Sequence, residues 1–496
     1  MDLTETQPEA GVLAGEQRML IDGELGYSVS NAMFDVVNPA TEEVVGQAAD
    51  GTVADLERAV GAARRAFDST NWSRDVDFRH RCLMQLHAAL ERNKERLRRI
   101  VITEVGCPIS VTASQIEDPI AEVQHWAEHG HSFNYLEDTG VHDTVLGAAR
   151  RSIHYDPVGV VGAITPWNVP LYLNIAETVP ALMAGNTVVL KPAQLTPWSG
   201  SELGRIVATE TGIPAGVFNV VVSNDNAVGA ALSADPRVDM ITFTGSTATG
   251  RAILAAAAPT VKKTMLELGG KSAHIVCDDA DLNVCLPMAA MMACVMSGQS
   301  CTLPSRILLP RTRYDEGVEI LRASMALCPV GDPWDPGKMQ GPQISETQRQ
   351  KVLGLIRSGV ESGATLVTGG GIPNELPTGY YVQPTLLTDV DPDSRVAQEE
   401  IFGPVLCVIP YDSEEQAISI ANNSIYGLSG EVSSGDLERA LEIAKRLRTG
   451  SVTVNAKMFF GITSPFGGTK QSGLGRRNGE HGFKEYLEIK TIGLPA

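Results

Sequence analysis

Hydrophobic and polar positions follow two different patterns along the chain, and the change falls near residue 158. Before it, apolar residues recur at helical spacing, which predicts amphipathic helices over 56–67 and about 76–104. Thr52 followed by Asp55 marks the start of the first helix. The stretch 140–155 alternates between apolar and polar residues without enclosing a core, so we predict an extended arm there.

Beyond residue 158, short apolar runs rich in β-branched residues alternate with helical patterns. Strands are predicted at 158–164, 187–190, 217–222 and 238–243, and helices at 198–211, 225–233 and 248–257. This alternation predicts βαβ units and a parallel sheet that is covered on both faces. In that architecture nucleotides bind at the carboxyl ends of the strands.

A second α/β unit begins near residue 264. Its predicted helices cover 282–296, 347–362, 414–422 and 437–448, and its strands lie at 306–309, near 366, and at 381–387 and 405–410. The nearly apolar segment 284–296 is too short to span a bilayer and is interpreted as a buried helix ahead of Cys301. Residues 485–494 predict an edge strand, which an arm of another subunit could pair.

Composition narrows the classes of function. A length of 496 residues favours about three domains. The net charge of −19 argues against binding to nucleic acid or to an anionic membrane. Residues 1–10 lack the features of a secretion signal, and eight scattered cysteines form no C-x-x-C pair. We therefore expect reduced thiols, a cytoplasmic location and no zinc site.

Two turns marked by glycine carry a thiol and a carboxylate: Gly298-Gln299-Ser300-Cys301 and Glu267-Leu268-Gly269-Gly270. A thiol can attack a carbonyl carbon, and a nearby carboxylate can then activate water to release the product. Most free cysteines, however, are buried and inert, and charged residues in turns are usually solvated. The pair alone leaves both a hydrolase and a dehydrogenase open.

Two predicted strands end in candidate cofactor residues. Gly245 and Ser246 join a strand to a helix, so the turn can be tight and the helix N-terminus favours a negative group. The G-x-G-x-x-G pattern is absent, and such turns are common. Lys191 closes another strand, where it could bind a ribose or a phosphate or be an ordinary surface lysine.

Asn168 lies in a loop between two prolines, Pro166 and Pro170. A rigid amide donor suits a developing oxyanion and is worth roughly 3 kcal/mol, although the amide could instead satisfy the loop backbone. Glu400 and Phe402 place a carboxylate near a ring that could pack against a nicotinamide or in the core.

His125, His129 and His131 have a spacing that would suit a metal, but no partner carboxylate stands out. We interpret them as a solvated helix face and expect no metal site.

Seven motifs occur in order along the chain: Pro166-Trp167-Asn168, Lys191-Pro192-Ala193, Phe243-Thr244-Gly245-Ser246, Glu267-Leu268-Gly269-Gly270-Lys271, Gly298-Gln299-Ser300-Cys301, Glu400-Ile401-Phe402-Gly403-Pro404 and Pro465-Phe466-Gly467-Gly468. Together they resemble the aldehyde dehydrogenase superfamily, over about residues 21–492.

The resemblance implies roles for the catalytic residues. Cys301 would form a thiohemiacetal with the aldehyde, while the Asn168 amide and the Cys301 backbone N–H hold the oxyanion. Hydride transfer to the nicotinamide would leave a thioester, which water activated by Glu267 hydrolyses.

The resemblance also implies a cofactor site. Lys191 would bind the adenosine ribose, Ser246 the pyrophosphate and Glu400 the nicotinamide ribose, with Phe402 beside the ring. The remaining residues assigned to this site are Trp167, Gln194, Gly245, Gly250 and Leu268.

The implied fold is α/β, with a Rossmann-like cofactor domain at 1–132 and 152–263 and a catalytic domain at 264–475. A β-strand oligomerisation arm would comprise 133–151 and 476–496, and the resemblance favours a homotetramer over a dimer.

Two departures from the family pattern bear on specificity. Gln194 stands where a glutamate is frequent, so the site repels a 2′-phosphate less; we expect NAD, with NADP as the alternative. Val169 and Ala176 are small where aromatic residues are frequent. We therefore expect a wide tunnel for an apolar or bulky aldehyde, lined by Val169, Leu173, Phe460 and Phe466.

Three competing interpretations remain. An acylating dehydrogenase would pass the thioester to coenzyme A, but it would not need Glu267. A catalytically silent scaffold of the same fold would not need the full catalytic set. A papain-like hydrolase requires a histidine partner for the cysteine, and its local sequence signature is missing.

Overall fold

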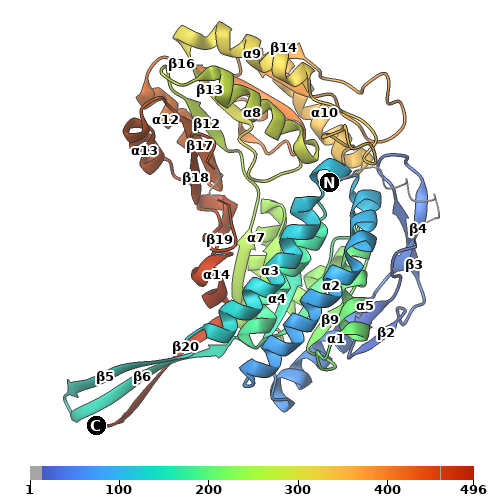
Figure 1. Cartoon of the computed structure of the whole chain (residues 1–496), viewed down its shortest axis with the longest axis vertical. Helices are drawn as coiled ribbons and strands as arrows, with labels where there is room; N and C mark the ends of the chain where they lie inside the picture. The colour runs from blue at the N-terminus through green and yellow to red at the C-terminus, as the bar shows by residue number, and fades with distance from the viewer. Residues whose placement is uncertain (1–13, 458–459) are drawn as a thin grey trace.

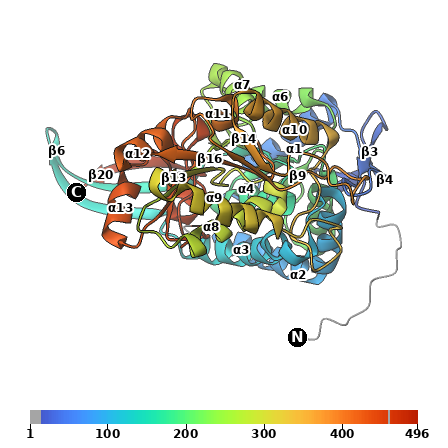
Figure 2. The ribbon, with the colours of Figure 1, turned by 90° about the horizontal axis from the view of Figure 1, so that it is seen from above.

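The computed structural model describes residues 14–457 and 460–496. Two α/β bodies lie against each other, and a long β arm extends away from both of them (Figure 1 and Figure 2). The sequence interpretation of residues 1–10 concerns a part of the chain outside the described residues. Within the described ranges, every helix is too short or too polar to cross a membrane.

The first body is built on an eight-stranded sheet with the order β19-β11-β10-β7-β8-β9-β1-β2. Its five central strands, from β11 to β9, run parallel to one another, as the sequence predicts, and the flanking strands β19 and β1 pair antiparallel. The strands are β1 (Met19–Ile21), β2 (Glu24–Gly26), β7 (Val160–Ile164), β8 (Thr187–Lys191), β9 (Phe218–Val220), β10 (Met240–Thr244), β11 (Lys263–Glu267) and β19 (Gly473–Leu474).

Seven long helices belong to this body: α1 (Val53–Ser69), α2 (Val76–Val105), α3 (Ala113–Ser132), α4 (Pro170–Ala184), α5 (Pro197–Glu210), α6 (Asn226–Ala234) and α7 (Thr247–Ala257). The α1 helix begins at a capping box, in which Thr52 and Asp55 bond reciprocally. The sequence did not predict α4, because every one of its residues is buried. A helix covered on all sides has no polar face and so loses the periodic signal.

The second body contains a seven-stranded sheet with the order β14-β15-β16-β13-β12-β17-β18, parallel except at β14. Its strands are β12 (Ala273–Val276), β13 (Arg306–Pro310), β14 (Thr365–Thr368), β15 (Thr385–Thr388), β16 (Val405–Tyr411), β17 (Ser429–Ser433) and β18 (Ser451–Val454). Its helices are α8 (Leu282–Cys294), α9 (Tyr314–Ala326), α10 (Glu346–Glu361), α11 (Arg395–Gln398), α12 (Glu414–Asn422) and α13 (Leu437–Arg446).

The arm is a three-stranded sheet of β5 (Leu136–Thr144), β6 (Gly147–Pro157) and β20 (Leu487–Pro495). The predicted arm over 140–155 is therefore extended, as expected. The C-terminal strand follows α14 (Gly479–Glu485) and pairs along its whole length with β6 of the same chain, and it forms one edge of the arm sheet, as the sequence predicts. A separate hairpin joins β3 (Met33–Val37) and β4 (Val44–Ala49).

Two sequence expectations need correction. The predicted boundary at residue 264 falls inside β11, so the strand that ends at Glu267 belongs to the first sheet, as does β19. The α8 helix is not buried throughout, because Val284, Met288 and Met291 are exposed on one side while the other side packs on the second body. The segment is apolar on both sides and has no clear periodicity, so the sequence pattern does not distinguish the exposed side of the helix from the buried side.

Asn186 ties the start of the arm's C-terminal strand to the first body. Its side chain is fully buried, accepts from the Gly159 N–H at 2.8 Å, and donates to the carbonyls of Ala181 and Tyr486 at 3.0 Å each. These bonds join α4, β7 and the segment after α14.

Replacing Asn186 by alanine should lower the free energy of unfolding by about 3 kcal/mol, since each buried polar group left unpaired costs about 1–3 kcal/mol. Urea unfolding followed by fluorescence measures the change. The exposed Asn283 provides the control: Asn283→Ala should change stability by less than about 0.5 kcal/mol. Equal losses in the two variants would contradict the assignment.

Candidate active site

The carboxyl ends of four adjacent parallel strands form one edge of the first sheet. The register aligns Ile164 with Lys191, Phe243 with Ile164, and Thr244 with Glu267. The loop of Trp167 and Asn168 follows β7, Lys191 ends β8, Ser246 follows β10, and Glu267 ends β11. Backbone pairing thus brings five of the predicted site residues to the same edge.

Two loops of the second body contact this edge. The Asn168 side chain donates at 2.9 Å to the carbonyl of Gln299, which lies two residues before Cys301. The Glu400 carboxylate accepts from the Gly270 N–H at 3.0 Å. The rings of Trp167 and Phe402 meet edge to face with their centroids 5.3 Å apart. The predicted site is therefore assembled from both bodies.

Close backbone packing places the thiol-bearing loop against the turn that follows Glu267. A Cβ on Gly270 would lie 2.3 Å from the Cys301 carbonyl oxygen, which real structures do not allow. A Cβ on Gly298 would lie 2.2 Å from the Gly403 backbone, and Gly298 has a φ of +69°. Glycine is required at both contacts.

The loop before Cys301 has a strained backbone, and hydrogen bonds to residues 341–343 hold it in place. Met296 and Ser297 have φ values of 53° and 58°, a region that side chains other than glycine seldom adopt. The Ser297 hydroxyl donates to the Gly341 carbonyl at 2.7 Å, and Gln343 donates to the Ser297 carbonyl at 2.9 Å. The sequence analysis did not identify this clamp, because nothing marks 341–343 as neighbours of the loop.

Cys301 as a whole residue is partly exposed, but its thiol lies inward and has its pKa raised to about 12. Burial is the main cause, and the negative charges of Glu400 and Glu267 add to it, while Arg477 opposes them. The thiol is therefore neutral at pH 7 and would have to lose its proton to act as a nucleophile.

The Glu267 carboxyl is buried, and neither of its oxygens has a hydrogen-bond partner among the described residues. Burial raises its pKa to about 8, Arg477 lowers it, and Glu177 raises it further. Because the folded-state pKa lies above the usual value, the carboxyl is protonated below pH 8 and becomes a base as the pH rises through 8. That range suits general-base catalysis near neutral pH.

The candidate cofactor residues fit a dinucleotide. Lys191 is 5% exposed, forms no ion pair within the described part of the chain, and donates only to the Pro192 carbonyl at 3.4 Å. Burial lowers its pKa to about 8, against the effect of Asp225 and Asp50. Ser246 caps α7 and is exposed, so the positive end of this helix is open to an anionic group.

Other predicted members of that site lie around the same edge. Gly250 packs on Leu268, because a Cβ there would approach the leucine side chain to 2.6 Å. Gly245 forms the turn after β10, and Gln194 is half-buried just beyond Lys191.

The residues predicted to line the aldehyde tunnel gather in a small apolar cluster outside the main cores. Tyr172, Leu173 and Ala176 form it, with Val169 packed against them. The Phe460 ring lies 6.2 Å from the Tyr172 ring and 5.4 Å from the Phe466 ring. The cluster thus connects the loop of Asn168 with the segment that contains Phe466.

Sequence reasoning missed a buried ion pair beside Glu267. Arg477 is 4% exposed and pairs with Glu177 of α4, which is fully buried. The only signal was a pair of arginines shortly after the Pro465-Phe466-Gly467-Gly468 motif, and arginines after a glycine-rich turn are usually exposed.

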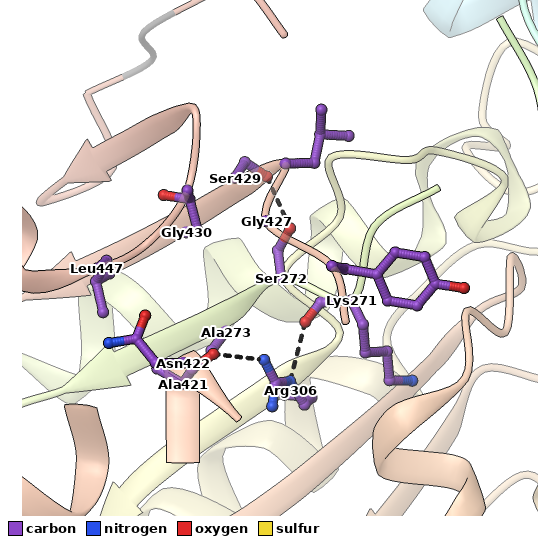
Figure 3. Close-up of a pocket in the computed structure, with 13 residues that line it drawn as sticks. Lys271, Ser272, Ala273, Arg306, Ala421, Asn422, Gly427, Ser429, Gly430 and Leu447 are labelled. Carbon is purple, nitrogen blue, oxygen red and sulfur yellow. Dashed lines mark hydrogen bonds between the residues drawn. The ribbon is translucent and has the colours of Figure 1, made fainter. Parts of the chain in front are cut away.

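Two other features lie apart from this site. No group of His, Cys, Asp and Glu in residues 14–457 and 460–496 is arranged to hold a metal ion, and the His125 ring stacks on that of His129 at 6.0 Å. A cavity of about 10 Å³ between Arg306 and the loop of Ser429 has room for about one water molecule (Figure 3). It is too small for a substrate.

Comparison with known proteins gives a consistent class. The model of the aldehyde dehydrogenase family matches residues 27–492. The 3-succinoylsemialdehyde-pyridine dehydrogenase of a Pseudomonas species is 44% identical over 95% of this chain and 97% of that protein. Human mitochondrial aldehyde dehydrogenase is 38% identical, over 96% and 91% of the two chains.

Solved structures agree with that class. A mutant of aldehyde dehydrogenase C from Pseudomonas syringae, in complex with NAD+ and octanal, is 40% identical and superposes with a TM-score of 0.91 over 96% of each chain. An aldehyde dehydrogenase of Mycobacterium tuberculosis complexed with NAD+ is 41% identical, with a TM-score of 0.91 over 97% and 99%.

The chain belongs to the aldehyde dehydrogenase family. It is an NAD(P)-dependent oxidoreductase that converts an aldehyde to a carboxylic acid. The resemblance found in the sequence motifs and the α/β fold that it implied are confirmed.

The variant Gly298→Ala should lose at least about 100-fold in kcat, since displacing a reacting group by about 1 Å can cost that much. The added methyl group would overlap the Gly403 backbone and displace the cysteine loop. Steady-state kinetics and thermal unfolding measure the effect.

Gly363→Ala is the matched control. Gly363 has a φ of +100° but nothing within 4 Å of an added Cβ. It carries the same kind of backbone strain without the clash, so its kcat should stay unchanged and only a modest loss of stability should appear. Equal losses of kcat would show that strain, rather than contact with Gly403, explains the result.

Proposed function

We propose that this enzyme oxidises a bulky, apolar aldehyde with NAD by covalent catalysis at Cys301. The observation that carries this proposal is the meeting of Cys301, Glu267 and Asn168 at one strand edge beside the apolar cluster of Val169, Tyr172, Leu173 and Ala176.

The first step is attack of the Cys301 sulfur on the aldehyde carbon. A carbon–sulfur bond forms, the thiol proton passes to the ionised fraction of Glu267 or to water, and the carbonyl oxygen becomes an oxyanion. The Asn168 amide and the Cys301 backbone N–H donate to that oxyanion. Asn168 is already oriented by its bond to Gln299, which it exchanges for the substrate.

NAD, when bound, supplies the acceptor for the hydride that leaves the thiohemiacetal carbon and so converts this adduct into a thioester. Once the thiol proton has passed to solvent, Glu267 takes a proton from water, whose oxygen attacks the thioester carbon, and later returns this proton to the departing Cys301 sulfur. The carbon–sulfur bond breaks, the carboxylic acid leaves, and Cys301 recovers its proton. The presence of this base favours hydrolysis over transfer of the acyl group to coenzyme A.

The cofactor preference is assigned to NAD. Lys191 and Ser246 would hold the adenosine ribose and the pyrophosphate, and Glu400 the nicotinamide ribose. Trp167, Phe402, Gly245, Gly250 and Leu268 would complete the site. A neutral Gln194 can accept from ribose hydroxyls, and the two solved relatives described above carry NAD+.

The substrate class is inferred from the size and polarity of the side chains expected to line the tunnel. Val169 and Ala176 are small, and Leu173, Phe460 and Phe466 add apolar surface. By their names, one relative acts on a pyridine-bearing semialdehyde and another holds octanal. These names are consistent with an aldehyde larger than acetaldehyde.

The assembly and location are also proposals. The arm of β5, β6 and β20 stands away from the body and exposes Val145 and Leu146 almost completely, which favours a homo-oligomer, with a tetramer preferred over a dimer. Eight free cysteines suit a reducing compartment such as the cytoplasm.

An aldehyde panel with NAD and with NADP, followed by absorbance of the reduced cofactor, tests the reaction. Cys301→Ala should abolish turnover, whereas Cys285→Ala, which removes another buried thiol, should retain it. Glu267→Gln should keep a rapid burst of NADH but slow steady-state turnover at least about 100-fold, the scale of a general base.

Other outcomes of the same experiment would redirect the proposal. Formation of acyl-CoA on addition of coenzyme A would favour the acylating reaction. Unchanged turnover in Glu267→Gln would remove this residue from the mechanism, and no NADH with any aldehyde would favour a silent scaffold.

A bulkier residue at position 169 should narrow the tunnel. Val169→Phe is expected to lower kcat/KM for octanal or an aromatic aldehyde by about 10- to 100-fold, equivalent to about 1–3 kcal/mol of lost fit, with little effect on acetaldehyde. Val44→Phe, on an exposed strand, is the control. If wild-type kcat/KM is highest for acetaldehyde, the proposed substrate class is wrong.

A further inference from the structure

Arg477 is fixed by several elements of the first body. Its backbone pairs with that of Phe466 at 2.6 and 2.7 Å. Its guanidinium forms the ion pair with Glu177 and donates to the Thr244 hydroxyl at 2.6 Å. Glu177 also accepts from Thr242 and Thr244, while the Tyr486 hydroxyl donates to its carbonyl at 3.1 Å. The guanidinium therefore has one well-defined position.

A buried ion pair of this kind is costly to build. Removing two charges from water costs several kcal/mol per ion, and their attraction offsets this only when additional hydrogen bonds satisfy both groups. Glu177 has such bonds, whereas the Arg477 Nε is buried without a hydrogen-bond partner among the described residues. The arginine therefore retains unused hydrogen-bonding capacity.

Glu267 has hydrogen-bond acceptors without donors, which complements the unpartnered donor of Arg477. Both of its oxygens are buried and unpartnered within the described chain, and they lie close to the backbone that leads to Arg477, since a Cβ on Gly467 would be 2.7 Å from Oε1. Arg477 attracts the charge of Glu267 but makes its ion pair with Glu177. A single water molecule between them would give both groups a partner.

The charged surroundings of Glu267 come from three segments. Arg477 and Arg476 favour its ionised form, and Glu177 disfavours it. Cys301 faces it from the second body. The groups that face Arg477 are Glu177, Glu267, Tyr172 and Tyr486, and Glu122 bonds the Tyr172 hydroxyl at 3.2 Å. The Arg477 guanidinium donates to Thr244 of β10, and Thr244 is the register partner of Glu267 in β11, so the arginine end of the ion pair lies beside the strand end that carries the carboxyl.

We propose that Arg477, anchored by Glu177 and Thr244, is a positioning residue for thioester hydrolysis that favours the ionised form of Glu267, the form that can take a proton from water at the acyl-enzyme. The inference rests on the proposed role of Glu267 as the base that activates water. Without Arg477, Glu267 keeps a negative neighbour in Glu177 and stays protonated up to a higher pH. A protonated carboxyl cannot accept a proton from water.

The test compares Arg477→Gln, Arg477→Lys and Glu177→Gln with wild type, in full-length enzyme with its best aldehyde, from pH 6 to 10. Stopped flow gives the NADH burst, and steady-state assays give kcat. Arg477→Gln should retain the burst, shift the midpoint of the kcat profile upward by about one pH unit and lower kcat about tenfold below that midpoint, as one pKa unit is a factor of ten. Arg477→Lys should restore most of the wild-type profile.

Glu177→Gln should shift the midpoint in the opposite direction. The amide retains hydrogen bonds to its neighbours but removes the negative charge, so the profile should move to lower pH. A merely structural role would change stability without moving the two profiles in opposite directions. Arg311→Gln, which breaks an exposed ion pair with Asp412, is the matched control and should leave the profile unchanged.

An unshifted profile in a folded Arg477→Gln enzyme would overturn the inference. If that variant does not fold, Glu177→Gln decides, and a profile that stays in place or moves upward overturns it. Failure of the proposed function gives a different result from failure of this inference. If Glu267 is not the base, Glu267→Gln itself leaves kcat unchanged. If Glu267→Gln slows turnover and the Arg477 variants do not shift the profile, only the present inference fails.

Discussion

The register of the parallel strands β7, β8, β10 and β11 is the constraint on which the rest of the structure depends. The carboxyl ends of parallel strands lie along one edge of the sheet. Strand pairing alone therefore brings the residues that follow these strands together. Glu267 illustrates this, because its backbone is paired on both sides, with Thr244 of β10 and Gly473 of β19. The carboxyl that we propose as the base for thioester hydrolysis is thereby attached to a strand that is hydrogen-bonded on both sides.

The thiol reaches this edge in a different way. Cys301 lies in a loop of the second body with two strained residues before it, and contacts from 341–343 and from Gly403 hold that loop. Strain of this kind persists only where the surroundings determine the conformation. The proposed base and the proposed nucleophile therefore come from different bodies, and Gly270 packs against the Cys301 carbonyl where these bodies meet.

The sequence predicted the parts of this arrangement that depend on local patterns. Strands with β-branched runs, such as β7 and β8, and motif residues at their ends lie where the pattern placed them. It failed where burial erased periodicity, as in α4, and where an apolar helix has an exposed side, as in α8. It also missed Arg477, because its partner Glu177 is 300 residues away and no local pattern encodes that pairing.

Burial raises the pKa of both proposed reacting groups and so disfavours the ionised forms that the proposed chemistry needs. A nearby positive charge opposes this effect. Burial raises the pKa of Cys301 to about 12 and that of Glu267 to about 8. An isolated arginine beside Glu267 would bring a full unit charge into a site of low polarity, where it would be costly and would make the carboxylate a weak base. An arginine already paired with Glu177 presents a dipole instead. Its field falls off quickly with distance, so it can stabilise the charge of Glu267 while leaving that group basic enough to take a proton from water.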